Sequence, residues 1–236
     1  LDDLLGKSVR DQMVADVPLG AFLSGGIDSS LIVSLMQSQT SMPIETFTIG
    51  FSEADYNEAI YANKIAKHLG TKHTELYVSS NDALSVVDKL PQIYDEPFSD
   101  SSQIPTYLIS EMAKKNVTVS LSGDAGDELF GGYNRYLWIR QIWSRMKFIP
   151  ISLRKFISYG MTSVSPSVWN MILKQILDTP QPGDKMHKLS SILTSVSADD
   201  CYLNLISHWN ILDNIVIGAN DISTSVTDIH DRIDFD

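Results

Sequence analysis

Three absences narrow what this chain can be. It contains a single cysteine, Cys201, so no intrachain disulfide can form and we expect a reducing compartment, the cytoplasm. The sequence has no run of about 18 apolar residues of the kind that crosses a membrane. Lys and Arg do not cluster, and the formal net charge is −11. We therefore expect neither a membrane-spanning segment nor a nucleic-acid-binding surface.

The most familiar phosphate-binding motif, G-x-x-x-x-G-K-[ST], is absent as well. The composition is otherwise that of an ordinary globular protein, with 236 residues, of which 43% are hydrophobic and 20% charged. A chain of this length can bury one substantial core and carry a helical appendage. Cys201 has apolar neighbours at helical spacing, which favours a packing residue over a nucleophile.

A glycine turn organises the amino-terminal part of the chain. Ser24-Gly25-Gly26-Ile27-Asp28-Ser29-Ser30 follows an apolar run at 19–23 and precedes apolar residues at helical spacing, which predicts a strand, a tight turn and a helix. Adjacent glycines let the backbone approach an anion, while hydroxyls, a carboxylate and first-turn N–H groups supply donors or a metal ligand. The alternative is an ordinary turn in which Asp28 and Ser29 only cap the helix.

A second bend, Ser122-Gly123-Asp124-Ala125-Gly126-Asp127-Glu128, follows an apolar strand at 117–121. Mg²⁺ prefers a few carboxylates together with phosphate oxygens and water. Asp127 and Asp28 can hold one such ion if their strands end side by side, because parallel strands present their carboxyl ends to a common crevice. The alternative is a glycine turn in which Asp124 and Asp127 cap the next helix.

The remaining patterns predict an α/β fold. Strands are expected at 19–23, 44–51, 74–78 and 117–121, and helices at 1–16, 55–69, 81–90 and 104–115. We expect a parallel sheet of about five strands with helices on both faces, in a domain over 1–136, followed by a helical region over 137–236. His68 and His73 have no partners at metal-ligand spacing and are interpreted as ordinary polar residues.

A polar loop at 91–102 is braced by two prolines and carries several acidic residues. Shaped loops at strand ends often hold ligands, so its polar side chains are candidates for binding a substrate: Asp95, Asp100, Ser101 and Ser102. The alternative is an acidic surface loop that caps the following helix through Ser101 or Ser102.

The two bends together resemble a known family. The segment 23–30 is similar to the pyrophosphate loop of the N-type ATP pyrophosphatases, and the bend at 122–133 resembles the second signature of the asparagine synthetases within that group. The loop at 95–102 with Pro105-Thr106-Tyr107-Leu108 resembles the substrate side of the bacterial, glutamine-hydrolysing members. The likeness extends to Asp55, Glu58, the stretch 69–73 and the stretch 188–209.

The resemblance implies ATP-dependent asparagine synthesis. Such enzymes transfer AMP to the side-chain carboxylate of aspartate, release pyrophosphate, and let glutamine-derived ammonia displace AMP. Carried over to this chain, it implies catalytic roles for Asp124, facing the ammonia, and Asp127, with Mg²⁺ on Asp28 and Asp127. It also implies contacts with adenosine, made by Leu23, Ile49, Ser122 and Gly123. The residues implied to bind pyrophosphate are Ser24, Gly25, Gly26, Asp28, Ser29 and Ser30.

The resemblance further implies parts that these 236 residues do not contain. Glutamine hydrolysis belongs to an amino-terminal glutaminase domain, and the family's downstream Arg-x-Pro-[Phe/Leu]-Leu-Asp segment and phosphate-contacting Lys are absent too. We therefore expect a piece of a longer protein, and that longer protein could be a homodimer. The piece alone should have low activity, because the loss of one transition-state donor costs about 3 kcal/mol. Two alternatives stay open: a related adenylating amidotransferase or cyclase acting on a β-lactam precursor, peptide or sugar acid, and a non-catalytic nucleotide-binding module.

Overall fold

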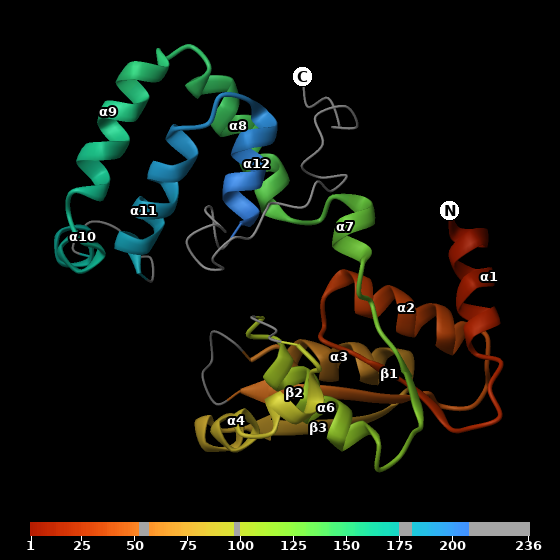
Figure 1. The fold of residues 1–236 in the computed structure, drawn as a ribbon. Coiled ribbons are helices and arrows are strands. Elements are labelled where there is room, and N and C mark those ends of the chain that lie inside the picture. The colour runs from red at the N-terminus through yellow and green to blue at the C-terminus, as the bar shows by residue number, and fades with distance from the viewer. Residues whose placement is uncertain (52–56, 97–99, 175–180, 208–236) are drawn as a thin grey trace. The chain divides into compact units, whose positions relative to one another are not determined.

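The computed structural model describes residues 1–51, 57–96, 100–174 and 181–207. The chain forms two compact units, which we call unit 1, residues 1–130, and unit 2, residues 131–236. Unit 1 contains the sheet, and unit 2 is helical in its described part (Figure 1).

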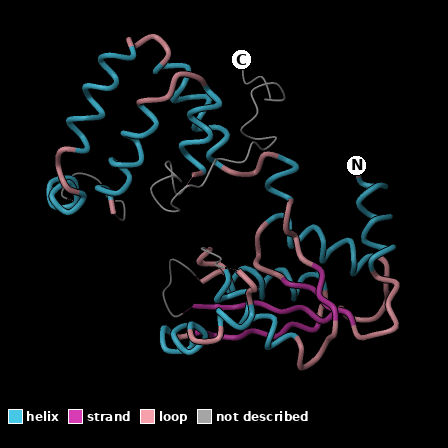
Figure 2. Tube along the Cα trace, in the orientation of Figure 1, coloured by secondary structure: helices cyan, strands magenta, loops and turns pink. Residues whose placement is uncertain are grey.

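The sheet of unit 1 is parallel throughout and has the strand order β3-β2-β1-β4 (Figure 2). Its strands are β1 (Leu19–Phe22), β2 (Glu45–Phe51), β3 (Lys72–Val78) and β4 (Val119–Leu121). In the register, Ala21 of β1 lies between Thr46 of β2 and Leu121 of β4. The expected parallel α/β fold is confirmed, with four strands in the described part of the chain where about five were expected. The four strands correspond to the four segments expected from the sequence.

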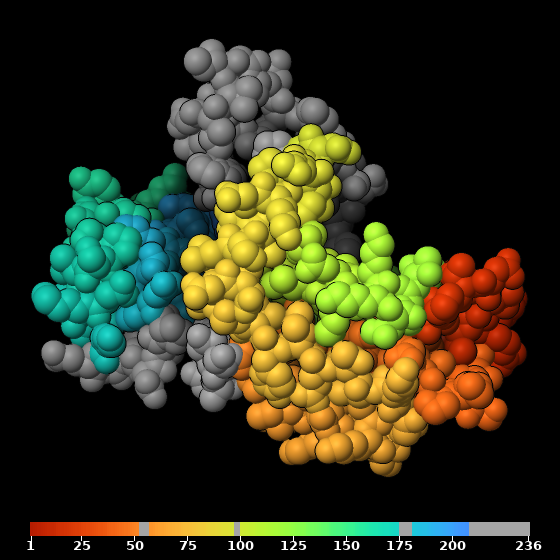
Figure 3. Space-filling view, turned by 90° about the horizontal axis from the view of Figure 1, so that it is seen from below, coloured from red at the N-terminus to blue at the C-terminus, as the bar shows by residue number. Residues whose placement is uncertain are grey.

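Helices cover both faces of the sheet, as expected. They are α1 (Asp2–Gln12), α2 (Ile27–Ser38), α3 (Ala59–Leu69), α4 (Ser80–Val87), α5 (Leu90–Ile93), α6 (Gln103–Ala113) and α7 (Gly126–Phe130). On one face, Ala21 packs with Val33 of α2 and Ala62 of α3. On the other, Phe47 of β2 packs with Met112 of α6. In Figure 3 the yellow and lime residues, which include α4 and α6, lie side by side on the surface of unit 1.

The helix ends follow from local chemistry. Gly70 ends α3 in the left-handed conformation that favours glycine, with φ +74°. Ser79 begins α4 through a reciprocal pair of hydrogen bonds with Asp82, a capping box. The helix expected at 55–69 begins at Ala59; Asp55 itself lies outside the described residues.

Unit 2 consists of α8 (Asn134–Met146), α9 (Ile151–Thr162), α10 (Pro166–Leu173), α11 (Pro182–Leu193) and α12 (Ala198–Ile206). Its core contains Cys201, whose fully buried thiol has a raised pKa because burial disfavours the thiolate. Buried Arg154 donates to three backbone carbonyl oxygens, those of Ile149, Leu193 and Ser195. Positions 208 and 209 of the stretch noted above lie outside the described residues. Throughout the described ranges, every helix is too short or too polar to cross a bilayer.

Candidate functional site

The sheet has a switch in direction beside β1. The chain runs outward from β1 to β2 and β3, and then returns to place β4 on the other side of β1. In parallel sheets, ligands bind at the carboxyl ends of the strands at such a switch. Both sequence motifs lie there: Ser24 follows β1 closely, and Ser122 directly follows β4.

The loop after β1 is shaped by its own hydroxyl groups. Ser29 Oγ accepts a hydrogen bond from the backbone N–H of Ser24 at 3.2 Å and lies 3.0 Å from Ser24 Oγ. Ser24 Oγ accepts from the N–H of Gly26, and Ser30 Oγ donates to the Gly26 carbonyl oxygen at 2.6 Å. The structure therefore gives the hydroxyls of Ser29 and Ser30 partners inside the loop, and their contact with pyrophosphate stays a prediction.

The amino terminus of α2 points its backbone donors into this loop. Gly26 is the N-cap, and no side chain caps the helix. The first N–H groups of a helix have no acceptor within the helix, and the helix dipole adds partial positive charge there. The alternative in which Asp28 and Ser29 serve as caps does not describe this end, since Asp28 lies in the first helical turn. N–H groups at such a helix end suit a phosphate.

The second motif packs directly onto the first. A Cβ atom at Gly123 would lie 2.6 Å from the backbone nitrogen of Ser29 and 2.8 Å from the carbonyl carbon of Asp28. A Cβ atom at Gly126 would lie 2.5 Å from Asp28 Cγ, and 2.7 and 2.9 Å from the two carboxylate oxygens. Real Cβ atoms do not come this close, so only glycine permits this approach. The structure thus brings together the two bends that the sequence placed far apart along the chain.

Three acidic residues belong to this junction. Asp28 is partly buried against Gly126, and Asp127 follows in the first turn of α7, also partly buried. Asp124 is exposed, and its Oδ2 accepts a hydrogen bond from Ser122 Oγ at 2.9 Å. Within the described ranges, no three His, Cys, Asp or Glu side chains are grouped closely enough to hold a metal ion by themselves. A cation held here would need ligands from a bound nucleotide.

Two further predicted contacts, Leu23 and Ile49, have side chains that pack inside the protein. Ile49 packs its side chain with Val78 and Leu108 in an apolar cluster, while Leu23 is buried and donates its N–H to the Phe47 carbonyl oxygen at 2.9 Å. Only their backbone can face a ligand at the strand ends.

The polar loop before α6 is tied to that helix. Asp100 Oδ1 accepts from the backbone N–H of Ser102 at 2.8 Å, whereas Ser102, the N-cap, makes no side-chain capping bond. Asp95 and Ser101 are exposed, and residues 97–99 lie outside the described ranges. The contact described between Asp100 and Ser102 thus lies at the start of α6, and the role of these residues in binding a substrate stays a prediction.

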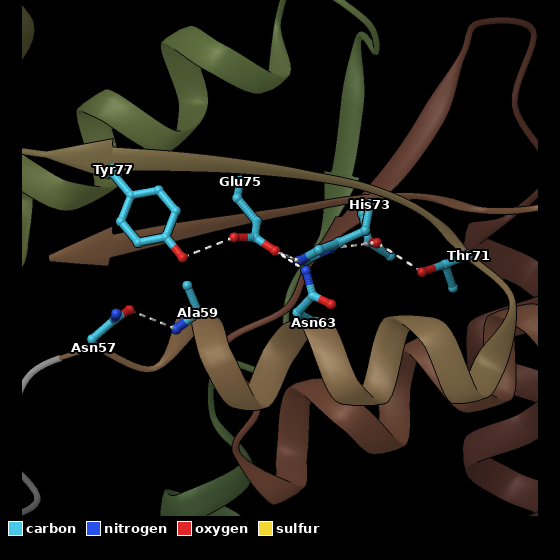
Figure 4. A network of polar contacts seen from close by, with 8 residues as sticks. Asn57, Ala59, Asn63, Thr71, His73, Glu75 and Tyr77 are labelled. Atoms are coloured by element: carbon cyan, nitrogen blue, oxygen red, sulfur yellow. Dashed lines mark hydrogen bonds and ion pairs between the residues drawn. The ribbon is translucent and has the colours of Figure 1, made fainter. Parts of the chain in front are cut away.

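Sequence reasoning missed a polar layer between α3 and the sheet (Figure 4). His73, Glu75 and Tyr77 alternate along β3 and face α3, where Asn63 donates a short hydrogen bond to Glu75 Oε1. Tyr77 donates to Glu75 Oε2 at 3.0 Å. The signal was available: polar residues at every second position of a strand predict one polar face.

Burial and hydrogen bonding set the charges in this layer. Burial lowers the pKa of His73, although nearby Glu75 acts in the opposite direction. The hydrogen bond from Asn63 is the largest cause that lowers the pKa of Glu75. At neutral pH this layer therefore holds a neutral imidazole beside an ionised carboxylate.

Comparison with known proteins agrees with the motifs. The family model described as asparagine synthase matches residues 1–217. A putative glutamine-hydrolysing asparagine synthetase of Methanocaldococcus jannaschii is 49% identical over 135 residues, 57% of this chain and 26% of that protein. Glutamine-hydrolysing asparagine synthetase 1 of Bacillus subtilis is 39% identical over 166 residues, 66% of this chain and 26% of that protein.

The chain thus spans about a quarter of the length of these curated relatives. Among solved structures, an NH3-dependent NAD synthetase from Campylobacter jejuni aligns with 83% of this chain and 95% of its own, with 12% identity and a TM-score of 0.39, a likeness too low to bear on function. The family model covers nearly the whole chain, and the matched residues include both bends. The chain therefore belongs to the asparagine synthase family.

Proposed function

We propose that unit 1 binds ATP with Mg²⁺ at the junction of the two bends, and that the protein containing this chain uses this ATP to make asparagine. The proposed substrates are aspartate and glutamine-derived ammonia. The observation that carries the proposal is the packing of Gly123 and Gly126 against Asp28, because it brings two separate motifs into contact at the ends of β1 and β4. Family membership and the names of the relatives supply the substrates.

The residues present fit a magnesium nucleotide. The uncapped amino terminus of α2 offers N–H donors to the phosphates, and Asp28 and Asp127 offer two carboxylates beside them. Mg²⁺ commonly binds proteins through one or two carboxylates, with phosphate oxygens and water completing its shell. When bound, the ion would neutralise phosphate charge and stabilise the departing pyrophosphate.

The loop hydroxyls have a shaping role in this proposal. Because Ser24 and Ser29 bond to each other and to the loop backbone, they fix the turn before a ligand arrives. A preformed turn avoids the entropy cost of ordering donors during the reaction. Leu23, Ile49, Ser122 and Gly123 would then contact adenosine through backbone groups at the strand ends.

The proposed reaction has two steps. The aspartate side-chain carboxylate attacks the α-phosphorus, a bond forms between them, and the bond to the bridging oxygen breaks so that pyrophosphate leaves. Ammonia then attacks the activated carbonyl carbon, AMP departs, and the nitrogen loses a proton. Asp124 is proposed to accept that proton, because its exposed carboxylate is held in place by Ser122. Asp95, Asp100, Ser101 and Ser102 are proposed to lie on the aspartate side.

Calorimetric titration of the chain with ATP and Mg²⁺ tests the site. We expect binding by the wild type and at least about tenfold weaker binding by Asp28→Ala, since a ligand to the ion and its charge are both lost. Asp3→Ala, which removes an acidic residue from the first turn of α1 instead, is the matched control and should bind normally. Mg²⁺ without nucleotide should give no measurable heat. Equal affinity of Asp28→Ala and wild type would refute the site.

Isotope exchange between ATP and pyrophosphate in the full-length protein tests the reaction. We expect exchange that depends on aspartate and is absent with glutamate or without an amino acid. Exchange supported by another carboxylic acid and not by aspartate would exclude asparagine synthesis and favour a relative that activates a different acceptor.

A further inference from the structure

Strand β3 turns a polar face toward a helix that would normally cover apolar side chains. His73 Nδ1 lies 2.9 Å from Thr46 Oγ1, which in turn lies 2.9 Å from Thr71 Oγ1. Farther along the strand, Glu75 bonds to Asn63 in the middle of α3 and to Tyr77 (Figure 4). The Glu75 side chain is only 20% exposed. A half-buried carboxylate in this position is costly unless donors satisfy it.

These polar contacts fix α3 in a way that apolar packing cannot. Apolar contacts tolerate sliding and rotation, whereas hydrogen bonds lose strength steeply as their geometry changes. Glu75 accepts from α3 on one oxygen and from β3 itself on the other, so it joins helix to strand at a single register. Gly50 leaves space for the Tyr77 ring, because a Cβ atom at that position would lie only 2.7 Å from a carbon atom of the ring.

The register of α3 matters to the loop after β1. Gly25 has φ +87°, and a Cβ atom there would lie 2.8 Å from the backbone nitrogen of Ala62 and 2.8 Å from Tyr61 Cβ. The phosphate loop thus rests on the first turn of α3 with no space between them. Asn63, which Glu75 holds, directly follows Ala62. A shift of α3 by a fraction of an ångström would press on Gly25 or leave it unsupported.

We propose that Glu75 is a positioning residue for the phosphate loop: by holding Asn63 it sets α3 against Gly25 and keeps the loop in its anion-binding shape. This role rests on the proposed function for its consequence in nucleotide binding. Glu75 itself does not contact the loop and acts through α3.

Hydrogen–deuterium exchange of the full chain without nucleotide tests the positioning. In Glu75→Ala we expect the amides of 24–30, including the bonded N–H groups of Ser24 and Gly26, to exchange at least about fivefold faster, because the loop opens more often. Asn63→Ala removes the same contact from the helix side and should act similarly. Glu75→Gln keeps a carbonyl oxygen for Asn63 and should restore exchange to within about twofold of wild type.

A second carboxylate provides the matched control. Glu45 at the start of β2 pairs with Lys72 at 2.6 Å and is 23% exposed, much like Glu75, but lies at the opposite ends of the strands from the loop. Glu45→Ala should leave exchange at 24–30 unchanged. Equal acceleration in Glu45→Ala and Glu75→Ala would show general destabilisation and overturn the proposal, as would no acceleration in either Glu75→Ala or Asn63→Ala.

Titration with MgATP separates this inference from the proposed function. We expect Glu75→Ala to bind about tenfold more weakly than wild type and Glu75→Gln nearly normally. If the wild type does not bind while the exchange pattern holds, the nucleotide site fails and the positioning of the loop stands. If the wild type and Glu75→Ala bind equally well, the role of Glu75 in ligand binding is refuted.

Discussion

Replacing Gly126 by Ala should separate binding from stability. The new Cβ would lie 2.5 Å from Asp28 Cγ, whereas non-bonded carbon atoms rest at about 3.5–4 Å, so the carboxylate must retreat by about 1 Å. The obstacle is the end of a side chain, which can rotate away. Because Gly126 is not in the left-handed region, Ala fits its backbone, and we expect the free energy of unfolding to change by less than about 1 kcal/mol.

The function of the site should fall far more. A misplacement of about 1 Å at a reacting centre can lower turnover about a hundredfold. We therefore expect Gly126→Ala to weaken MgATP binding about tenfold by calorimetry and to reduce ATP–pyrophosphate exchange in the full-length protein about a hundredfold. Thermal unfolding of the same preparations measures the stability.

Two other glycines calibrate this experiment. Gly123→Ala would press on backbone atoms of α2, which cannot rotate away, so it should lower stability by about 1–3 kcal/mol as well as binding. Gly6→Ala lies in α1, where no atom is within 4 Å of the new Cβ atom. This variant should bind MgATP normally, and its free energy of unfolding should rise by about 0.5–1 kcal/mol. Normal MgATP binding and normal exchange by Gly126→Ala would show that the position of the Asp28 carboxylate does not matter for either, and would refute the proposed nucleotide site.

Three further substitutions test other parts of the structure. Gly25→Ala should lower the free energy of unfolding in urea more than Gly70→Ala does. Both glycines have positive φ, where an alanine costs about 1–2 kcal/mol, but only at Gly25 would the new Cβ atom also contact other atoms. Burial lowers the pKa of His73 from its ordinary value of 6.5, so the imidazole of the unfolded chain is protonated at a higher pH than that of the folded chain. The free energy of unfolding should therefore fall as the pH drops below about 6.5, by at most about 1.4 kcal/mol per pH unit. His73→Asn should make the urea midpoints measured between pH 7.5 and 5.5 less dependent on pH. Arg154→Met should lower the free energy of unfolding by about 3 kcal/mol, because buried carbonyl oxygens lose their donor; an unchanged urea midpoint would contradict this.

The sequence predicted those features that depend on local pattern. The sequence pattern located each strand of the sheet, and the glycine-rich bends were recognised at the ends of β1 and β4. Element type follows from periodicity over neighbouring residues, which is why these predictions succeed. The strand expected at 74–78 is present and begins at Lys72.

Features that depend on distant packing were not predicted. A hydroxyl beside two glycines can face a ligand or its own loop, and only the folded turn shows that Ser29 and Ser30 bond inward. Likewise, the interpretation of His73 as an ordinary polar residue did not reveal that it and Glu75 lie beneath a helix. That depends on which face of the sheet α3 covers, which is a long-range property.

The same distinction explains the glycines of the two bends. Their presence predicts turns, yet in the structure Gly25, Gly123 and Gly126 each stand where another chain segment comes within van der Waals contact. At Gly25 and Gly123 the nearest contacts include backbone atoms of α3 and α2, and at Gly126 they are the carboxylate atoms of Asp28. In the proposed site a phosphate would bind to N–H groups of α2, which suits a chain of net charge −11 whose segment 24–30 has no lysine. We therefore expect a glycine-to-alanine substitution in these bends to weaken nucleotide binding more than the removal of any one serine hydroxyl.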